Sequence, residues 1–118
     1  MRYMLLIYDR EADWAKLKEQ DQGALYAEYG VFTEGIRKSG HYKAGDPLQT
    51  IATATTVRVR NGKTVTTDGP FAETREQLGG YYIVDAKDLD EATAIAARIP
   101  SARMGSIEVR PIMETSQP

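Results

Sequence analysis

The chain of 118 residues contains no cysteine and only one histidine. The lack of cysteine excludes thiol catalysis, disulfide bonds and Cys-ligated metals. A zinc site would have to be built almost entirely from carboxylates and water, so no metal is expected. The sequence also lacks a Gly-x-Gly-x-x-Gly or Walker pattern, and Gly79-Gly80 is too short for a phosphate loop. We therefore expect no cofactor.

Excess positive charge and long apolar runs are also missing. The chain has 15 Lys and Arg against 17 Asp and Glu, a formal net charge of −2. Nucleic acid and anionic membranes are therefore poor candidate partners. The apolar run at residues 3–8 reaches Asp9 too soon for a signal peptide or a membrane span. We expect one domain over residues 1–118 and a cytoplasmic location.

Two segments, residues 3–8 and 81–85, are apolar at both odd and even positions. A strand with this pattern is covered on both faces of its sheet. Helices of the same chain can cover one face. A second subunit is the natural candidate for the other, so we expect a homodimer.

Three segments have helical patterns. Residues 11–19 predict a short helix, and residues 22–39 carry an amphipathic stripe. A third helix follows Asp88, which is a candidate N-cap with Glu91 three residues later. The expected buried positions of the second and third helices are Leu25, Tyr29, Phe32, Ile36, Leu89, Ala92, Ile95, Ala96 and Ile99.

A hairpin is predicted between the two halves of the chain. Residues 54–60 alternate, with Val57 and Val59 on the expected buried side, and residues 63–67 are also strand-like. Asn61-Gly62 between them is typical of a type I′ turn. Further strands are expected within residues 41–50 and over residues 105–112. The resulting order predicts an α+β fold, a ferredoxin-like sandwich with an inserted hairpin.

The hairpin leads into Asp-Gly-Pro-Phe at residues 68–71, which we call the DGPF loop. Together with Ala-Glu-Thr-Arg-Glu-Gln-Leu-Gly-Gly-Tyr-Tyr at residues 72–82, it resembles the YciI-related, DGPF-domain family. Residues 3–8 and 107–111 resemble the ends of that family. The resemblance covers nearly the whole chain.

The resemblance implies a dimeric α+β barrel, in which two ferredoxin-like subunits place their sheets face to face. The family has no agreed reaction. Some YciI-type relatives carry a His–Asp pair near the first helix, but here the sole histidine, His41, lies beyond that helix. The pair therefore cannot be transferred. DGPF-type members also resemble proteins encoded beside extracytoplasmic-function sigma factors, which implies an accessory or regulatory role.

Asp68 is the candidate catalytic residue, and it has two interpretations. Its carboxylate can accept a backbone N–H of its own turn, as an Asx turn does. Alternatively, the carboxylate is held by a proline-stiffened loop at the mouth of a pocket and acts as an acid or a base.

The candidate ligand-binding residues each have a simpler alternative. Tyrosines on central strands commonly serve the core alone, charged residues after the loop are usually solvated, and a lone histidine is usually a surface residue. The candidates are Tyr8, His41, Phe71, Glu73, Arg75 and Tyr82.

Two functional hypotheses follow. The first is a dimeric protein that binds a small molecule in a pocket between the sheet and the DGPF loop, with or without enzyme activity. The second is a non-catalytic accessory protein, in which the same loop clasps the dimer or contacts a partner such as a transcription factor.

Overall fold

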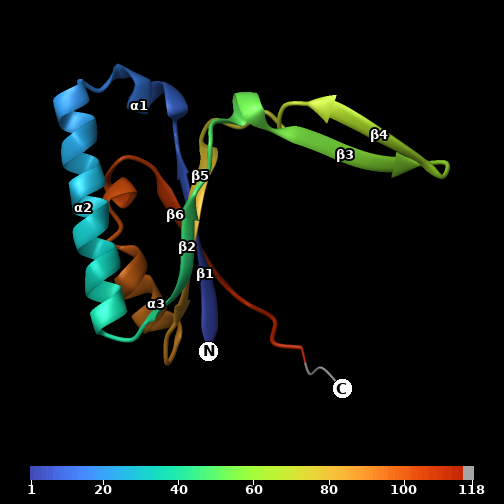
Figure 1. The fold of residues 1–118 in the computed structure, drawn as a ribbon. Helices are drawn as coiled ribbons and strands as arrows, with labels where there is room; N and C mark the ends of the chain where they lie inside the picture. The colour runs from blue at the N-terminus through green and yellow to red at the C-terminus, as the bar shows by residue number, and fades with distance from the viewer. Residues whose placement is uncertain (116–118) are drawn as a thin grey trace.

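The computed structural model describes residues 1–115 and shows a four-stranded antiparallel sheet with helices on one of its faces, and a separate two-stranded hairpin (Figure 1). The strands are β1 (Arg2–Asp9), β2 (Tyr42–Pro47), β3 (Thr55–Arg60), β4 (Lys63–Asp68), β5 (Gln77–Asp85) and β6 (Ser106–Pro111). The α-helices are α1 (Glu11–Lys16), α2 (Glu19–Lys38) and α3 (Leu89–Ala96), and short 3-10 turns lie at Ile51–Thr53 and Pro100–Arg103.

The main sheet has four strands in the order β2-β5-β1-β6, and every neighbouring pair is antiparallel. In the middle of β1, Leu5 lies opposite Tyr82 of β5 and Val109 of β6. Each half of the chain forms a strand–helix–strand unit, and the two units interleave in one sheet. This confirms the predicted ferredoxin-like α+β fold with its inserted hairpin, which is the fold of the dimeric α+β barrels.

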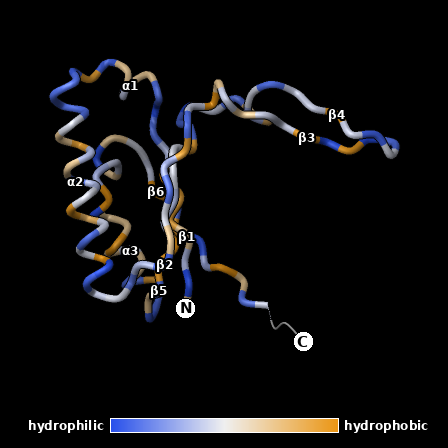
Figure 2. Tube along the Cα trace, in the orientation of Figure 1, coloured by the Kyte–Doolittle hydropathy of each residue, from blue (hydrophilic) through white to orange (hydrophobic). Residues whose placement is uncertain are grey.

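The core lies between the sheet and the helices. Alternate residues of β1 are buried on the helix side, and α2 packs Leu25, Phe32 and Ile36 against the same layer. Figure 2 shows apolar residues along the sheet and on the inner sides of α2 and α3. The buried apolar cluster consists of Tyr3, Leu5, Ile7, Phe32, Ile36, Tyr82, Val84, Ala86, Ala92, Ile95, Ala96 and Ile99.

Helix α3 begins as its sequence predicts. The Asp88 side chain accepts a hydrogen bond from the Glu91 backbone N–H at 2.9 Å. The Glu91 carboxylate reaches back to the Lys87 N–H at 3.1 Å, one residue before the position expected for a capping box. Leu89, however, is 53% exposed, so its assignment to the buried stripe was wrong. At about 100° per residue it lies at the margin of the face that α3 buries.

The β3–β4 hairpin forms through the predicted turn. Asn61 and Gly62 have φ angles of 52° and 74°, the left-handed values that a type I′ turn requires. The hairpin does not add to the main sheet but projects from it on the side away from the helices (Figure 1). Val57 and Val59 are therefore 60% and 61% exposed, and the side predicted to be buried has no cover within residues 1–115.

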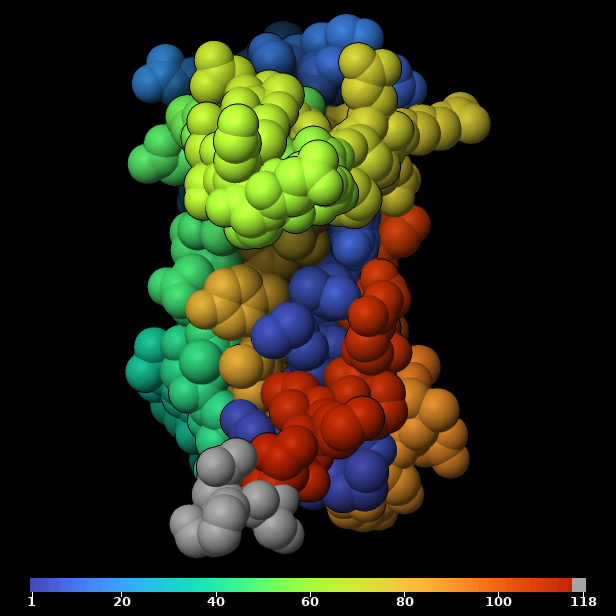
Figure 3. Space-filling view, turned by 90° about the vertical axis from the view of Figure 1, so that its right-hand side faces the viewer, coloured from blue at the N-terminus to red at the C-terminus, as the bar shows by residue number. Residues whose placement is uncertain are grey.

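The second face of the main sheet is open. Within residues 1–115 no helix lies on it, and the side chains of Met4 and Leu6 on β1 are only partly buried (Figure 3). The hairpin borders this face at one end. Among the described residues, no helix is both long and apolar enough to cross a membrane.

Candidate ligand-binding site

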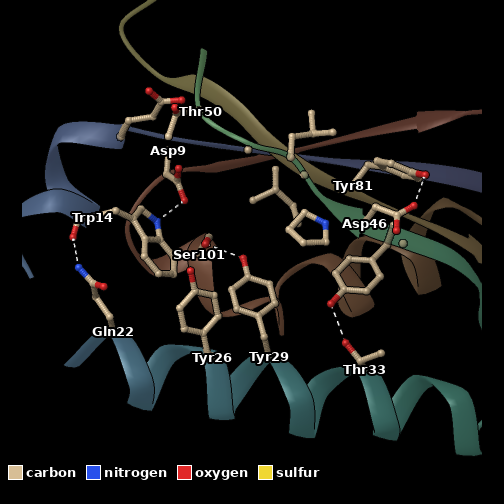
Figure 4. Close-up of a pocket in the computed structure, with 18 of the residues that line it drawn as sticks. Asp9, Trp14, Gln22, Tyr26, Tyr29, Thr33, Asp46, Thr50, Tyr81 and Ser101 are labelled. Atoms are coloured by element: carbon tan, nitrogen blue, oxygen red, sulfur yellow. Dashed lines mark hydrogen bonds between the residues drawn. The ribbon is translucent and has the colours of Figure 1, made fainter. Parts of the chain in front are cut away.

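A cleft of about 570 Å³ lies between α2 and the helix-facing side of the sheet (Figure 4). One wall is a row of α2 side chains at spacings of four, three, four and four residues, which places them on one side of the helix. The row consists of Gln22, Tyr26, Tyr29, Thr33 and Arg37.

Asp9 supplies a buried carboxylate at one end of the cleft. The residue is only 7% exposed, and its Oδ2 accepts a hydrogen bond from the Trp14 indole Nε1 at 2.8 Å. The Trp14 ring in turn lies 5.6 Å from the Tyr26 ring, centroid to centroid. Because a buried charge costs free energy unless it is hydrogen-bonded, the indole N–H both stabilises and orients this carboxylate.

Sequence reasoning missed Asp9, although a signal was present. Tyr3, Leu5 and Ile7 occupy every second position of β1, and the same alternation places Asp9 on the buried face. An acid that continues a buried stripe at the end of a strand indicates a functional site better than an acid in an exposed loop does. Asp9 instead appeared as the polar residue that ends an apolar run.

Segment α1 closes this end of the cleft and is held by side-chain to backbone hydrogen bonds. The Glu11 N–H donates to Gln77 Oε1 at 3.0 Å, and Glu11 Oε2 accepts from the Ile51 N–H at 2.9 Å. Gln22 Nε2 donates to the Trp14 carbonyl at 3.0 Å. These contacts fix a six-residue helix that buries no side chain of its own.

Two tyrosines in the cleft have hydroxyls bonded within the chain. Tyr29 donates to Ser101 Oγ at 2.5 Å, and the Tyr82 hydroxyl lies 2.7 Å from Thr33 Oγ1. Burial raises the pKa of both phenols above the usual value for tyrosine. They therefore serve as neutral lining and positioning groups near neutral pH.

The other end of the cleft carries a cation. The Arg37 guanidinium lies 4.3 Å from the centroid of the Tyr42 ring. Asp46 also borders the cleft, and its Oδ2 accepts a hydrogen bond from the Tyr81 hydroxyl at 2.7 Å. Gly45 allows the Tyr82 ring to pack directly on the β2 backbone, since a Cβ there would come within 2.6 Å of Tyr82 Cδ1.

The DGPF loop lies outside the cleft, at the base of the hairpin. Asp68 is exposed, and within residues 1–115 its carboxylate makes no hydrogen bond, so the expected Asx turn is not formed. The loop is fixed by Gly69 instead, which has a φ of 99° and donates its N–H to the Ala54 carbonyl at 2.7 Å. Phe71 is 81% exposed, and Glu73 and Arg75 are exposed beyond it.

The other predicted site residues are dispersed. Tyr82 lines the cleft. Tyr8 lies on the opposite face of the sheet, since its neighbours Ile7 and Asp9 point towards the helices. His41 lies between Ser39 Oγ at 2.7 Å and Glu91 Oε1 at 3.1 Å, away from the cleft lining.

The cleft offers a carboxylate at one end, a cation at the other and aromatic rings between them. Such a site suits a small organic molecule whose ring contacts Trp14, Tyr26 or Tyr42 and whose polar groups reach the charged ends. Across residues 1–115, no three His, Asp or Glu side chains are grouped as a metal ion would need.

Fold and cleft together define a ferredoxin-like α+β protein with a candidate small-molecule site. The chain belongs to the family of the YCII-related domain, which it matches over residues 1–116. It is 32% identical over 114 residues to an uncharacterised protein of Rhizobium meliloti (strain 1021), covering 95% of this chain and 92% of the relative.

A solved structure shares the fold. It is 5-chloro-2-hydroxyhydroquinone dehydrochlorinase (TftG) from Burkholderia phenoliruptrix AC1100, in complex with 2,5-dihydroxybenzoquinone. The TM-score is 0.57 at 15% sequence identity, and the match covers 98% of this chain and 96% of that chain.

Proposed function

We propose that the protein binds a small, planar, hydroxylated organic molecule in the cleft and that Asp9 accepts a hydrogen bond from it. The observation that carries this proposal is the Asp9 carboxylate, which is 7% exposed, borders the cleft and engages only one of its oxygens with Trp14. A ligand hydroxyl would satisfy the remaining acceptor capacity of this carboxylate.

The aromatic lining supports a ring-shaped ligand. Trp14, Tyr26 and Tyr42 border the cleft and present aromatic surface to its interior. The dehydrochlorinase that shares this fold was solved with a small, planar, dihydroxylated ring compound. A ligand of that chemical class would place a ring between aromatic side chains and a hydroxyl near Asp9.

If the protein catalyses a reaction, Asp9 is the proposed base. A general base must come within hydrogen-bond reach of the proton that it removes, and Asp9 meets this condition for a ligand in the cleft. Asp68, the base favoured from the sequence, is exposed and does not line the cleft. The exposed Asp68 carboxylate therefore provides the matched comparison.

Calorimetric titration with 4-propylphenol, a neutral phenol whose hydroxyl can donate to Asp9, tests this proposal. Asp9→Asn is expected to weaken binding by about tenfold or more, because it removes a charge-assisted hydrogen bond. Asp68→Asn is expected to leave the Kd within about twofold. Equal affinities of wild type and Asp9→Asn would refute the role of Asp9. Loss of binding in Asp68→Asn alone would indicate that the ligand binds at the DGPF loop and not in the cleft.

The proposed assembly is a homodimer that covers the open face of the sheet. Met4, Leu6 and Ile83 on that face are only partly buried, and the hairpin beside it exposes Val57 and Val59. An open apolar sheet face of this kind is typical of an interface. Sedimentation velocity should show a dimer at micromolar concentration, and Leu6→Arg should shift it to a monomer. A wild-type monomer would contradict this assembly.

A second candidate function rests on Phe71. Its side chain is 81% exposed on a loop that the left-handed Gly69 fixes, as suits a preformed contact for a partner protein. In this role the protein would be a cytoplasmic accessory factor, with a sigma-factor-linked regulator as the proposed partner. Phe71→Ala should abolish capture of that partner while leaving ligand affinity unchanged. Unaltered capture would exclude Phe71 as the contact.

A further inference from the structure

We infer that the cleft selects an anionic hydroxylated aromatic compound, with the ligand hydroxyl at Asp9 and a carboxylate group at Arg37. This inference rests on the proposed function, because it assumes that the cleft is the binding site. It adds the charge of the ligand and its orientation in the cleft.

Arg37 has the surroundings of an unused anion-binding group. Among the described residues its guanidinium makes no hydrogen bond and lies within 4 Å of no carboxylate. Three other arginines, Arg2, Arg103 and Arg110, are each paired with a glutamate. The Tyr42 ring positions Arg37 from one side, at 4.3 Å, which leaves the N–H donors at the guanidinium edge available.

The carboxylates that border the cleft are engaged by the chain itself. Asp9 accepts from Trp14, Glu11 from the Ile51 N–H, and Asp46 from the Tyr81 hydroxyl. Each therefore has a protein donor, whereas the cation has no protein acceptor. A ligand that carries an acceptor for Arg37 complements the site better than one that carries a second cation.

The two ends impose opposite electrostatic effects on the tyrosines between them. Burial is the main cause of the raised pKa of both Tyr29 and Tyr82. The charge of Asp9 adds to the increase at Tyr29, while the charge of Arg37 opposes it at Tyr82. The field along the cleft is thus negative near Asp9 and positive near Arg37.

The spacing of the ends fits an elongated ligand. Tyr29, the α2 residue on which the charge of Asp9 acts, lies eight residues before Arg37, which corresponds to about 12 Å of helix. The flexible arginine side chain shortens the distance that a ligand must bridge. A phenol with a short carboxylate-bearing chain therefore matches the cleft better than a single compact ring.

Three phenols that share a para-hydroxyl ring test this inference: 3-(4-hydroxyphenyl)propionate, 4-propylphenol and tyramine, which carry anionic, neutral and cationic chains. Wild type is expected to bind the anion about tenfold more tightly than the neutral phenol, and tyramine most weakly. Arg37→Met should lower only the affinity for the anion, to the level of the neutral phenol. Arg98→Met is the matched control, because Arg98 also stacks on a ring, at 5.6 Å from Phe32, but does not line the cleft.

The outcomes separate the two proposals. Equal binding of all three phenols, with no effect of Arg37→Met, would overturn the charge selectivity and leave the proposed function intact. Tightest binding of tyramine would overturn it as well and would show that the carboxylates dominate the site. Failure of every phenol to bind at millimolar concentration would refute the proposed function, and the inference with it.

Discussion

Removal of the indole N–H that serves Asp9 should destabilise the protein. Trp14→Phe keeps an aromatic ring but leaves a carboxylate that is 7% exposed without its donor, which in the structure lies 2.8 Å away. Hydrogen bonds to charged groups contribute about 1.5–3 kcal/mol, and an unpaired buried charge carries its full desolvation cost. We expect a loss of about 2 kcal/mol from this contact.

The corresponding shift in melting temperature is readily measurable. At about 2.1 cal/mol/K per residue, the unfolding entropy of 118 residues is about 0.25 kcal/mol/K, so about 2 kcal/mol lowers the Tm by about 8 °C. Far-UV circular dichroism is the suitable signal, since Trp14 is the only tryptophan. The protein concentration must be held constant, because self-association would also change the Tm.

A double-mutant cycle separates this hydrogen bond from the loss of ring packing against Tyr26. In an Asp9→Ala background, Trp14→Phe should cost less than about 1 kcal/mol, because no buried charge then loses a donor. Equal costs of Trp14→Phe in the two backgrounds would refute the reasoning. The indole would then contribute packing alone.

Three further perturbations test other parts of the structure. Gly105→Ala should destabilise the protein by about 3 kcal/mol, because its Cβ would overlap the backbone of β1. Gly30→Ala has open space around it and should stabilise α2 by about 0.5–1 kcal/mol. Similar Tm values for the two variants would contradict this packing. Gly69→Ala should cost about 1–2 kcal/mol, since its φ of 99° is unfavourable for alanine, and an unchanged urea midpoint would argue against the fixed loop. Because Tyr29 and Tyr82 have raised pKa values, their contribution to stability is complete below the ordinary tyrosine pKa of about 10 and is lost as the pH rises through their folded-state pKa; a Tm that is constant well above pH 10 would contradict their burial.

The fold could be predicted because its signals are local. Asn61-Gly62 determines a turn by backbone sterics, and Asp88 begins α3 through a hydrogen bond that spans three residues. The apolar run at residues 3–8 likewise predicted a strand covered on both faces, and in the structure the helix-side face of β1 is buried. Leu89 and Val57 were misassigned because a periodic pattern gives the side of an element and not whether another element packs on it.

The candidate site could be predicted only in small part. The residues after the hairpin attracted attention because they combine an acid, a turn and a ring, yet Asp68 and Phe71 are exposed. Tyr82 was the one predicted ligand-binding residue that lines the cleft. The cleft combines residues from distant parts of the chain, and no short motif records that combination.

The sequence alone determined the order of strands and helices, the turn of the hairpin and the membership of a family, because each depends on interactions between near neighbours or on a contiguous string of residues. Only the tertiary structure decided which acid is buried and which arginine lines the cleft without a carboxylate partner among the described residues. Asp9 and Arg37 border one cleft because α2 packs on the sheet through Leu25, Phe32 and Ile36. That proximity arises from long-range packing, and the local sequence around either residue does not specify it.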